Sequence, residues 1–374
     1  MHAMPADVLT PRQLNRATLA RQMLLAREKT TALAAIERLV AMQAQWPRPP
    51  FVGLWSRVAG FERADLTSLF AQKKAVRATS LRGTIHVSSA KDYLGFRPVV
   101  QPVLEAGLQA ILKGRLDGMD MDAVTTRART MLATRPQTFA ALREQFLKAD
   151  PKSDERAMGY SVRMLLPLVQ VPEDGEPWAY SSQAAFALAD KWLGKKVTTT
   201  HSTPDPLILR YLAAYGPGTA ADFQAWSGVS REVTRTAFER LRPKLRTFRD
   251  EGNKELFDLP DAPRPSADVP APVRFIPEYD NLIAARADGR IVARGHRPRI
   301  FLSALRIAAT VLVDGVAAAT WKLDSTKKAA TITIDPFGKL SAKARKDIQS
   351  EAEDLVRFAE PDAKAHRVVF ASER

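Results

Sequence analysis

Residues 216–244 read GPGTAADFQAWSGVSREVTRTAFERLRPK. Gly218 and Thr219 form a helix cap before a helix expected at 220–226, because Thr is a preferred capping residue. Residues 227–230 are a tight turn that contains a glycine, and 231–242 is a candidate recognition helix. Two helices joined by a turn of this kind form the helix-turn-helix pattern.

The flanks of this stretch complete a winged helix. A helix is expected at 206–215, and strands at 245–249 and 255–259 enclose the turn Asp250-Glu251-Gly252-Asn253. The same order of helices and a hairpin recurs twice toward the N-terminus, so we predict three tandem units. The first unit has expected helices at 11–25, 31–42, 52–58 and 63–72 and strands at 75–80 and 83–88. The second has expected helices at 123–132, 137–147 and 155–166 and strands at 168–171 and 178–181.

The C-terminal part has a different pattern. A proline-rich connection leads into expected strands at 273–276, 291–294, 310–313, 318–323, 330–334 and 367–371, with one amphipathic helix at 341–359. The predicted fold class is α+β, mostly α, with three tandem winged-helix units and a β-rich C-terminal domain. The predicted boundaries are 1–118, 119–203 and 204–260 for the winged helices, 261–272 for the linker and 273–374 for the last domain.

Composition excludes several classes of site. The 374 residues include 56 Lys and Arg, 41 Asp and Glu, five scattered His and no Cys. A disulfide scaffold, an iron–sulfur cluster and a cysteine nucleophile are therefore excluded, and we expect no metal and no other cofactor. The longest apolar stretch, 307–321, is interrupted by Asp314, and the first residues lack the apolar core of a signal peptide. We therefore expect a cytoplasmic protein, associated with the nucleoid if it is bacterial.

The net charge of +15 is clustered. Residues 1–100 hold 15 basic and 6 acidic residues, and residues 231–249 hold seven basic and two acidic ones. Clustered positive charge favours a polyanion such as DNA as the partner. The alternative is a solvated basic surface, whereas membrane binding would need a basic amphipathic segment with a broad aromatic face, which this chain lacks.

The signatures of phosphate-cradling glycine loops, nucleophile elbows and zinc-binding His pairs are missing. The unusual feature is Gln43-Ala44-Gln45, which precedes a run of prolines. A Gln amide cannot remove a proton at neutral pH, but it can position a water and stabilise positive charge. That suffices for an N7-alkylated purine, whose cationic base is already an activated leaving group. The alternative is that both glutamines are ordinary residues of a helix end.

Several stretches spread over most of the chain share one family pattern: MQAQ (42–45), PFVGLWSR (50–57), LRGTIH (81–86), LLPLVQV (165–171), YLAAYGP (211–217), AWSG (225–228), FDLP (257–260) and FIPEYDNL (275–282). They resemble the AlkZ/YcaQ family of winged-helix DNA glycosylases, and the AlkZ-like branch is the closer match. The resemblance implies three winged helices in a C-shaped arrangement around DNA. It also implies monofunctional excision of N7-alkylpurines, including bulky adducts and interstrand crosslinks.

The family signature is Gln-x-Gln in the AlkZ-like branch and Gln-x-Asp in the other, so Gln43 and Gln45 are the implied catalytic residues. One stretch departs from the family pattern. Where the family has His-Ala-Asp-Arg, this chain has Arg286-Ala287-Asp288-Gly289, although Arg286 and Arg290 keep the segment basic.

The candidate DNA-binding residues are basic or polar side chains on the hairpins, on the candidate recognition helix and in the segment just named: Arg82, Thr84, Arg231, Arg235, Lys244, Arg246, Arg286 and Arg290. Arg82 and Thr84 could equally be part of the scaffold, and we interpret His86 as a hydrogen-bonded strand residue. The basic residues of 231–246 could instead form a solvated face.

Three functions therefore compete. The first is an alkylpurine DNA glycosylase that acts on double-stranded DNA as a monomer. The second is a winged-helix transcriptional regulator without catalysis, and the third is a silent scaffold or drug-sequestering protein. A regulator would be a symmetric dimer with a sequence-specific site, and the chain offers no long coiled coil for such a dimer.

Overall fold

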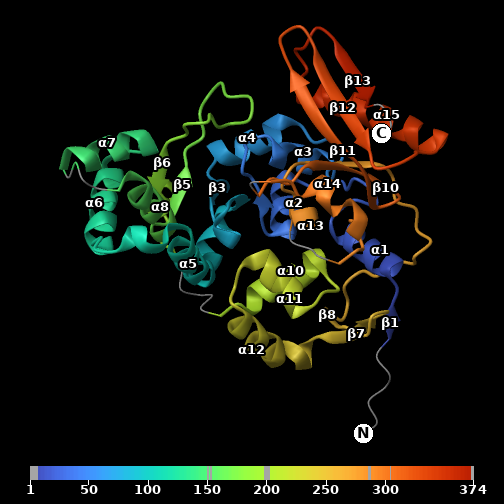
Figure 1. Ribbon diagram of the computed structural model, residues 1–374, viewed down its shortest axis with the longest axis horizontal. Helices are drawn as coiled ribbons and strands as arrows, with labels where there is room; N and C mark the ends of the chain where they lie inside the picture. Colours follow the sequence, from blue (N-terminus) through green and yellow to red (C-terminus); the bar gives the residue numbers. More distant parts are fainter. Residues whose placement is uncertain are drawn as a thin grey trace.

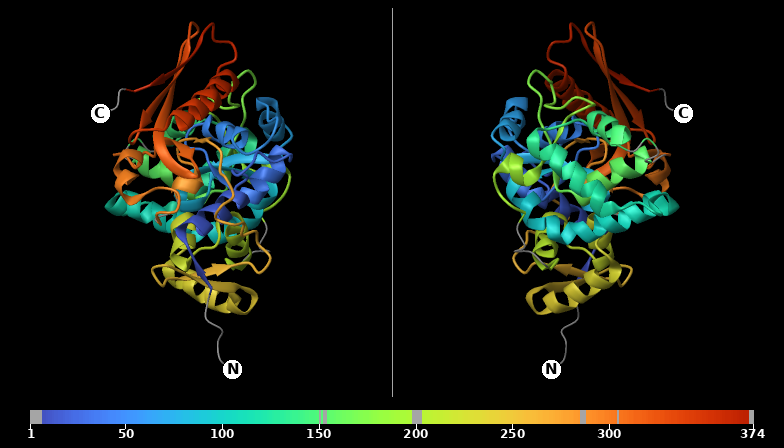
Figure 2. Two further views of the ribbon diagram at one scale, coloured as in Figure 1. Left: turned by 90° about the vertical axis from the view of Figure 1, so that its right-hand side faces the viewer. Right: turned by 90° about the vertical axis from the view of Figure 1, so that its left-hand side faces the viewer.

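The computed structural model describes residues 7–149, 151, 154–197, 203–284, 288–303 and 305–371. Three winged-helix units precede a β-rich C-terminal unit (Figure 1), which confirms the predicted fold class. Figure 2 shows the C-terminal sheet with α15 (Ala342–Ala359) at one end of the molecule and α12 (Arg231–Leu241) at the other. No helix among the described residues combines the length and the apolar character that crossing a membrane requires.

The third winged helix contains every element predicted for it, with each boundary within one residue: α10 (Asp205–Tyr215), α11 (Ala220–Ser227), α12, β7 (Arg246–Asp250) and β8 (Glu255–Asp258). Thr219 caps α11 in a capping box with Asp222. Gly228 follows α11 at φ +82, and a Cβ there would lie 2.7 Å from the side chain of Val103. The turn therefore requires glycine. An additional short strand, β1 (Val8–Leu9), pairs in parallel with β7.

The first winged helix is built from α1 (Pro11–Arg21), α2 (Ala32–Leu39), β2 (Met42–Gln43), α3 (Pro49–Trp55), α4 (Arg63–Ala71), β3 (Ala75–Thr79), the 3-10 helix η1 (Leu81–Gly83) and β4 (Ile85–Ser89). The helix predicted at 31–42 is too long, because α2 ends at Leu39 and Val40 has φ +68. Met42 and Gln43 pair with β4 instead, which places Gln43 on a strand.

The second winged helix has α6 (Met121–Thr134), α7 (Phe139–Ala149), α8 (Glu155–Leu165), β5 (Leu168–Gln170), β6 (Phe186–Leu188) and α9 (Ala189–Leu193). The strand predicted at 178–181 is wrong, since β5 pairs with β6. Trp178 and Tyr180 pack into the first unit instead, with ring centroids 5.1 Å from Phe51 and Phe70 respectively. Because β5 also pairs with β3, the two units share one sheet of order β2-β4-β3-β5-β6.

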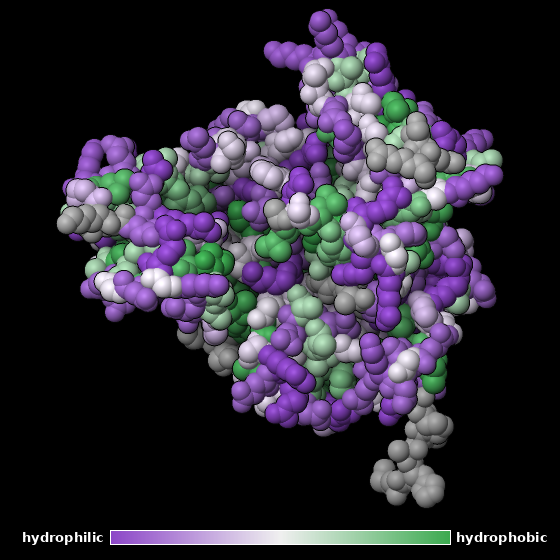
Figure 3. All heavy atoms as spheres, in the orientation of Figure 1, coloured by the Kyte–Doolittle hydropathy of each residue, from purple (hydrophilic) through white to green (hydrophobic). Residues whose placement is uncertain are grey.

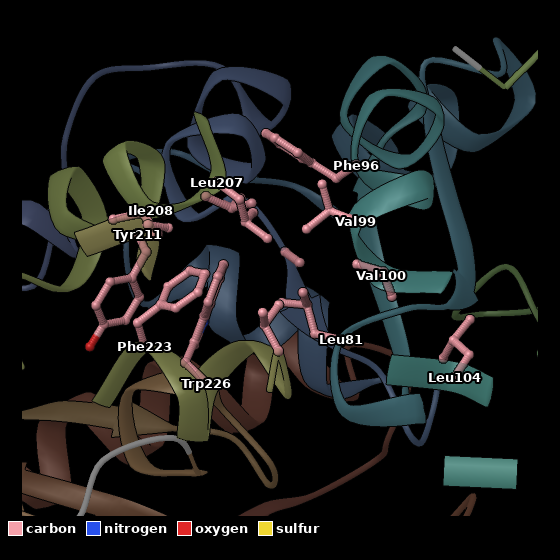
Figure 4. Close-up of a cluster of buried hydrophobic side chains, with 14 of the residues drawn as sticks. Leu81, Phe96, Val99, Val100, Leu104, Leu207, Ile208, Tyr211, Phe223 and Trp226 are labelled. Atoms are coloured by element: carbon pink, nitrogen blue, oxygen red, sulfur yellow. The ribbon is translucent and has the colours of Figure 1, made fainter. Parts of the chain in front are cut away.

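A long helix that the sequence did not predict, α5 (Ala90–Leu112), connects the first and second units, followed by the 3-10 helix η2 (Lys113–Leu116). Prolines at 98 and 102 lie inside α5, and internal prolines usually end a helix. Figure 4 shows side chains of α5, such as Phe96 and Val99, facing Leu207 on α10 of the third unit. The buried cluster holds the third unit against the other two.

The C-terminal unit is a five-stranded sheet of order β13-β12-β11-β10-β9. Its elements are β9 (Arg274–Ile276), α13 (Asn281–Ala284), the 3-10 helix η4 (Arg294–His296), α14 (Arg297–Ile300), β10 (Ala309–Val313), β11 (Val316–Ser325), β12 (Ala330–Pro336), α15 and β13 (His366–Phe370). Ile348 and Leu355 of α15 pack on Ile332 and other apolar residues of the sheet. The strand predicted at 291–294 is absent from the sheet, because Ile291 and Val292 are buried among helix residues such as Leu19.

The proline-rich segment before β9 lies against α1. Arg12 donates to Ala267 O, Arg16 to Val269 O and Arg21 to Pro263 O. Arg21 and Arg264 both pair with Asp258 at the end of β8, at 2.7 and 2.6 Å. These contacts fasten the segment to the first and third units along its length.

Candidate active site

Gln43 lies on the edge strand β2, opposite His86 on β4. Gln43 is 8% exposed. The Gln43 Oε1 accepts a hydrogen bond from Arg82 Nη2 at 2.8 Å. Because a guanidinium can only donate, the atom of the Gln43 amide that faces Arg82 must be oxygen. This contact therefore fixes the orientation of the amide.

Gln45 follows the end of β2 and is half-buried. Its backbone is held tightly, since Arg77 on β3 donates to Ala44 O at 2.9 Å and to Gln45 O at 3.2 Å. Burial lowers the pKa of Arg77 to about 10, so the guanidinium remains charged at neutral pH. Within the described part of the chain, the Gln45 amide makes no hydrogen bond. A firmly held backbone thus presents a side-chain amide that is available to a ligand.

A small cavity lies beside Gln43, between the first unit, the third unit and the C-terminal unit. Its lining includes Gln43, Pro49, Pro50, Tyr215, Asp280 and Asn281. Its volume of about 10 Å³ is close to the minimum for one water molecule. Three larger cavities, of about 840, 650 and 490 Å³, are lined by residues other than Gln43 and Gln45.

Arg82 connects the three units at this cavity. Its Nη2 also donates to Asn281 Oδ1 at 2.8 Å, and its Nη1 donates to Trp226 O at the end of α11. Burial lowers the pKa of Arg82 to about 10, which leaves it protonated at neutral pH. Asn281 in turn donates to Ala41 O at 2.9 Å, directly before β2. The geometry assigns Arg82 a set of internal contacts, and its contact with DNA stays a prediction.

Thr84 and His86 lie on the same hairpin as Arg82. Thr84 is half-buried and donates to Leu81 O at 3.2 Å. Its contact with DNA also stays a prediction. His86 is a buried residue of β4, as interpreted from the sequence, and its Nδ1 lies 3.1 Å from Thr84 O. Burial, and to a lesser extent the charge of Arg82, lower the pKa of His86 to about 3. His86 is therefore neutral at physiological pH.

The buried His86 predicts a specific loss of stability in acid. The unfolded chain binds a proton at His86 near pH 6.5 and the folded chain only near pH 3, so the free energy of unfolding falls as the pH decreases between these values. Between pH 7 and pH 5 we expect His86 to account for a loss of about 2 kcal/mol. Urea unfolding at pH 7 and pH 5 measures this loss in the wild-type protein, in His86→Gln and in the control His366→Gln. The loss between the two pH values should be smaller in His86→Gln than in the other two proteins. An unchanged difference in His86→Gln would contradict the assignment.

Four of the predicted DNA-binding residues lie on the third winged helix. Arg231 and Arg235 are exposed on α12, and in the part of the chain that the structure covers neither has an ion-pair partner. Lys244 is exposed at the end of the 3-10 helix η3 (Arg242–Lys244). Arg246 pairs with Asp7 at 2.6 Å. Figure 3 shows mainly hydrophilic side chains over this unit and over most of the same face of the molecule.

The structure corrects the prediction for Arg290, which is 4% exposed and cannot lie on a DNA-binding surface. Its Nη1 donates to Thr18 Oγ1 at 3.1 Å and to Pro217 O at 2.9 Å, and its Nη2 pairs with Asp288 at 2.9 Å. A surplus of basic residues in the sequence could not distinguish this internal connection from a surface charge. Arg286 lies outside the described residues.

Sequence reasoning did not identify Arg77 and Asn281 as parts of the site. Asn281 lies in the stretch FIPEYDNL, which was noted only as part of the family resemblance. Arg77 is the charged residue of a buried strand, Ala-Val-Arg-Ala-Thr. A charged residue in a fully buried strand is a signal that it has a specific partner.

Comparisons with known proteins identify the family of the chain. A family model described as DNA glycosylase AlkZ-like matches residues 36–358. The interstrand DNA cross-link repair glycosylase of Streptomyces sahachiroi is 24% identical over 362 residues, which cover 90% of this chain and 93% of that protein. The solved structure of the Streptomyces sahachiroi DNA glycosylase AlkZ has a similar fold, with a TM-score of 0.77, 20% identity and coverage of 97% of this chain and 100% of that one. Because the family model spans most of its length, the chain belongs to the AlkZ-like DNA glycosylase family.

Proposed function

We propose that this protein is a monofunctional DNA glycosylase that hydrolyses the N-glycosidic bond of N7-alkylated purines in double-stranded DNA. The observation that supports it best is the arrangement of Gln43 and Gln45. The Gln43 amide is oriented by Arg82 at a cavity of water size, and the Gln45 amide, on a fixed backbone, has no hydrogen-bond partner among the described residues. We expect the protein to act as a monomer in the cytoplasm, with base-excision repair as its role.

The reaction requires little from the protein. When the bond between C1′ and N9 breaks, its electron pair moves to the purine and neutralises the positive charge of the alkylated base. The sugar is left as a cation at C1′, a water adds to C1′, and the proton of that water passes to solvent. The carbonyl dipoles of Gln43 and Gln45 can orient the water and stabilise the sugar cation. Positioning of this kind contributes to the rate without an acid, a metal or a cofactor.

The size of the cavity also supports a broad range of adducts. A space of about 10 Å³ cannot enclose a purine, so the alkylated base must remain outside it. A base that lies outside this cavity meets no steric limit from the cavity walls on the size of its alkyl group. The name of the Streptomyces relative refers to interstrand cross-link repair. We therefore propose that bulky N7 adducts and interstrand crosslinks are also substrates.

The decisive experiment is the release of free 7-methylguanine from a methylated duplex. The proposal predicts release of the base by the wild-type protein, an intact abasic strand, and loss of release in Gln43→Ala and Gln45→Ala. A protein that binds DNA but releases no base from simple or bulky N7 adducts would overturn the proposal and favour the regulator. Equal release by all three proteins would exclude the glutamines from the reaction.

Arg231 and Arg235 are expected to contact phosphates of the DNA backbone. The double variant Arg231→Ala/Arg235→Ala should reduce the slope of log K against log salt concentration by about 2, because each phosphate contact contributes about 0.9 to that slope. Binding to an unmodified duplex, measured by fluorescence anisotropy at four salt concentrations, gives the slope. A matched double variant of the paired residues Arg240 and Arg242 serves as the control. An unchanged slope in the first variant would show that this helix does not contact DNA.

A further inference from the structure

Trp46 immediately follows Gln45 and is 59% exposed. The other large apolar side chains described as exposed are Val, Ile and Leu residues, so Trp46 is the largest of them. An indole that leaves this much apolar surface in water loses the stabilisation that burial would provide. An exposed aromatic ring beside a reaction site therefore suggests a contact with a ligand.

The exposure of Trp46 does not come from a loosely held loop. On one side, Arg77 binds the carbonyl groups of Ala44 and Gln45. On the other side, Arg48 lies 3.4 Å from Glu278, and the buried Pro49 begins α3. The chain is thus anchored within two or three residues of Trp46 in both directions, and the ring is presented by a rigid segment.

The faces of the Trp46 ring also have no stacking partner in the part of the chain that the structure describes. Trp55, Trp178 and Trp192 each have an Arg or Lys over the ring, at 4.2, 4.3 and 4.4 Å from the centroid. Trp226 and Trp321 are buried. Among the described residues, no cation and no other aromatic ring packs on Trp46. Of the six tryptophans, Trp46 is the one that is exposed and has neither a cation nor an aromatic ring on it among the described residues.

The position of Trp46 matches the proposed chemistry. Residues Ala41–Gln43 and Pro49–Pro50, on either side of it, line the water-sized cavity. Three residues of extended chain span at most about 11 Å, so Trp46 lies within that distance of Gln43 along the backbone. A nucleotide whose C1′ lies at the two glutamines therefore has its base within reach of the Trp46 ring.

We propose that Trp46 is the platform on which the alkylated purine stacks, and that it selects the cationic base over the neutral ones. The face of an indole is the most favourable aromatic surface for a cation, and base stacking on an aromatic ring adds further affinity. An unmodified purine has the stacking contribution but lacks the positive charge. This inference rests on the proposed glycosylase function, because it assumes a cationic purine at Gln43 and Gln45.

The test measures binding separately from base release. Dissociation constants are determined for three duplexes of one sequence, containing guanine, 7-methylguanine or the uncharged 8-oxoguanine, in a Gln45→Ala background that slows turnover, so that binding is measured before the base is released. We expect Trp46→Leu to weaken binding of the 7-methylguanine duplex about tenfold and that of the other two less than twofold, with Trp46→Phe intermediate. The control Trp192→Leu should leave all three unchanged.

Each outcome has a distinct meaning. Equal losses on all three duplexes, or no loss on any, would overturn the selective platform. These results do not depend on whether the wild-type protein releases a base, which the release assay establishes. A wild-type protein that releases 7-methylguanine while Trp46→Leu binds all duplexes normally would refute the role of Trp46 and leave the glycosylase proposal intact.

Discussion

Gln45→Ala should lower the single-turnover rate of 7-methylguanine release by about 100-fold, and Gln43→Ala by a similar factor. Removing one preorganised dipole from a site where charge develops in the transition state lowers the reaction rate by a factor of this order. Because both amides act on the same water and the same sugar cation, the double variant should be only slightly slower than either single variant. Release is measured with excess protein, so that product dissociation does not limit the rate.

The two glutamine variants should differ in their effects on folding. The Gln45 amide makes no hydrogen bond within the described chain, so its loss should change the free energy of unfolding by no more than about 0.5 kcal/mol. Gln43→Ala removes an acceptor of Arg82, which retains Asn281 and Trp226 O. Gln72→Ala, an exposed glutamine at the end of α4, is the matched control. A loss of release that follows a loss of folded protein would contradict the catalytic assignment.

Asp258→Ala should destabilise the protein by about 3–5 kcal/mol. The Asp258 side chain is fully buried, and its two oxygens accept from both terminal nitrogens of Arg21 at 2.7 and 2.8 Å. Arg21 is itself only 1% exposed, so the substitution leaves a buried guanidinium without its anion. Arg264, the second partner of Asp258, loses its contact at the same time. Urea unfolding of the two proteins measures the difference.

An exposed ion pair is the control for this prediction. Arg242 pairs with Glu255 at 2.8 Å on the wing of the third unit, where both side chains are about 40% exposed. Glu255→Ala should cost no more than about 1 kcal/mol, because solvent screens the pair. Similar losses in the two variants would show that burial does not determine the importance of the Asp258 contacts.

Local signals explain which elements could be predicted. Thr219, Gly228 and Ser230 act within the few residues around them, so the third winged helix was predicted almost residue by residue. The strand predicted at 178–181 failed because Trp178 and Tyr180 bury their rings in the neighbouring unit. No pattern within 178–181 indicates that these rings pack into another unit.

The same distinction applies to the candidate site. Gln43 and Gln45 could be proposed as candidate site residues from the sequence, because their spacing and the family resemblance both concern a few adjacent residues. The groups that hold them could not be predicted in the same way. Asn281 meets Arg82 across 199 positions of the chain, and Arg290 is buried by contacts with α1 and the third unit. From the distribution of charge along the sequence, a buried arginine such as Arg290 was interpreted as a surface residue.

The amino-acid sequence alone determined the helices of the three winged-helix units, the hairpins of the first and third units, the β-rich end and the position of the two amides along the chain. Turns, caps and alternation depend on neighbours in the chain, which the sequence contains directly. The tertiary structure decided that Gln43 lies on a strand and that two units share one sheet. It also decided which arginines are inside the protein. A buried guanidinium is stable only where distant carbonyl and carboxylate groups converge on it, and that convergence exists only after the chain has folded.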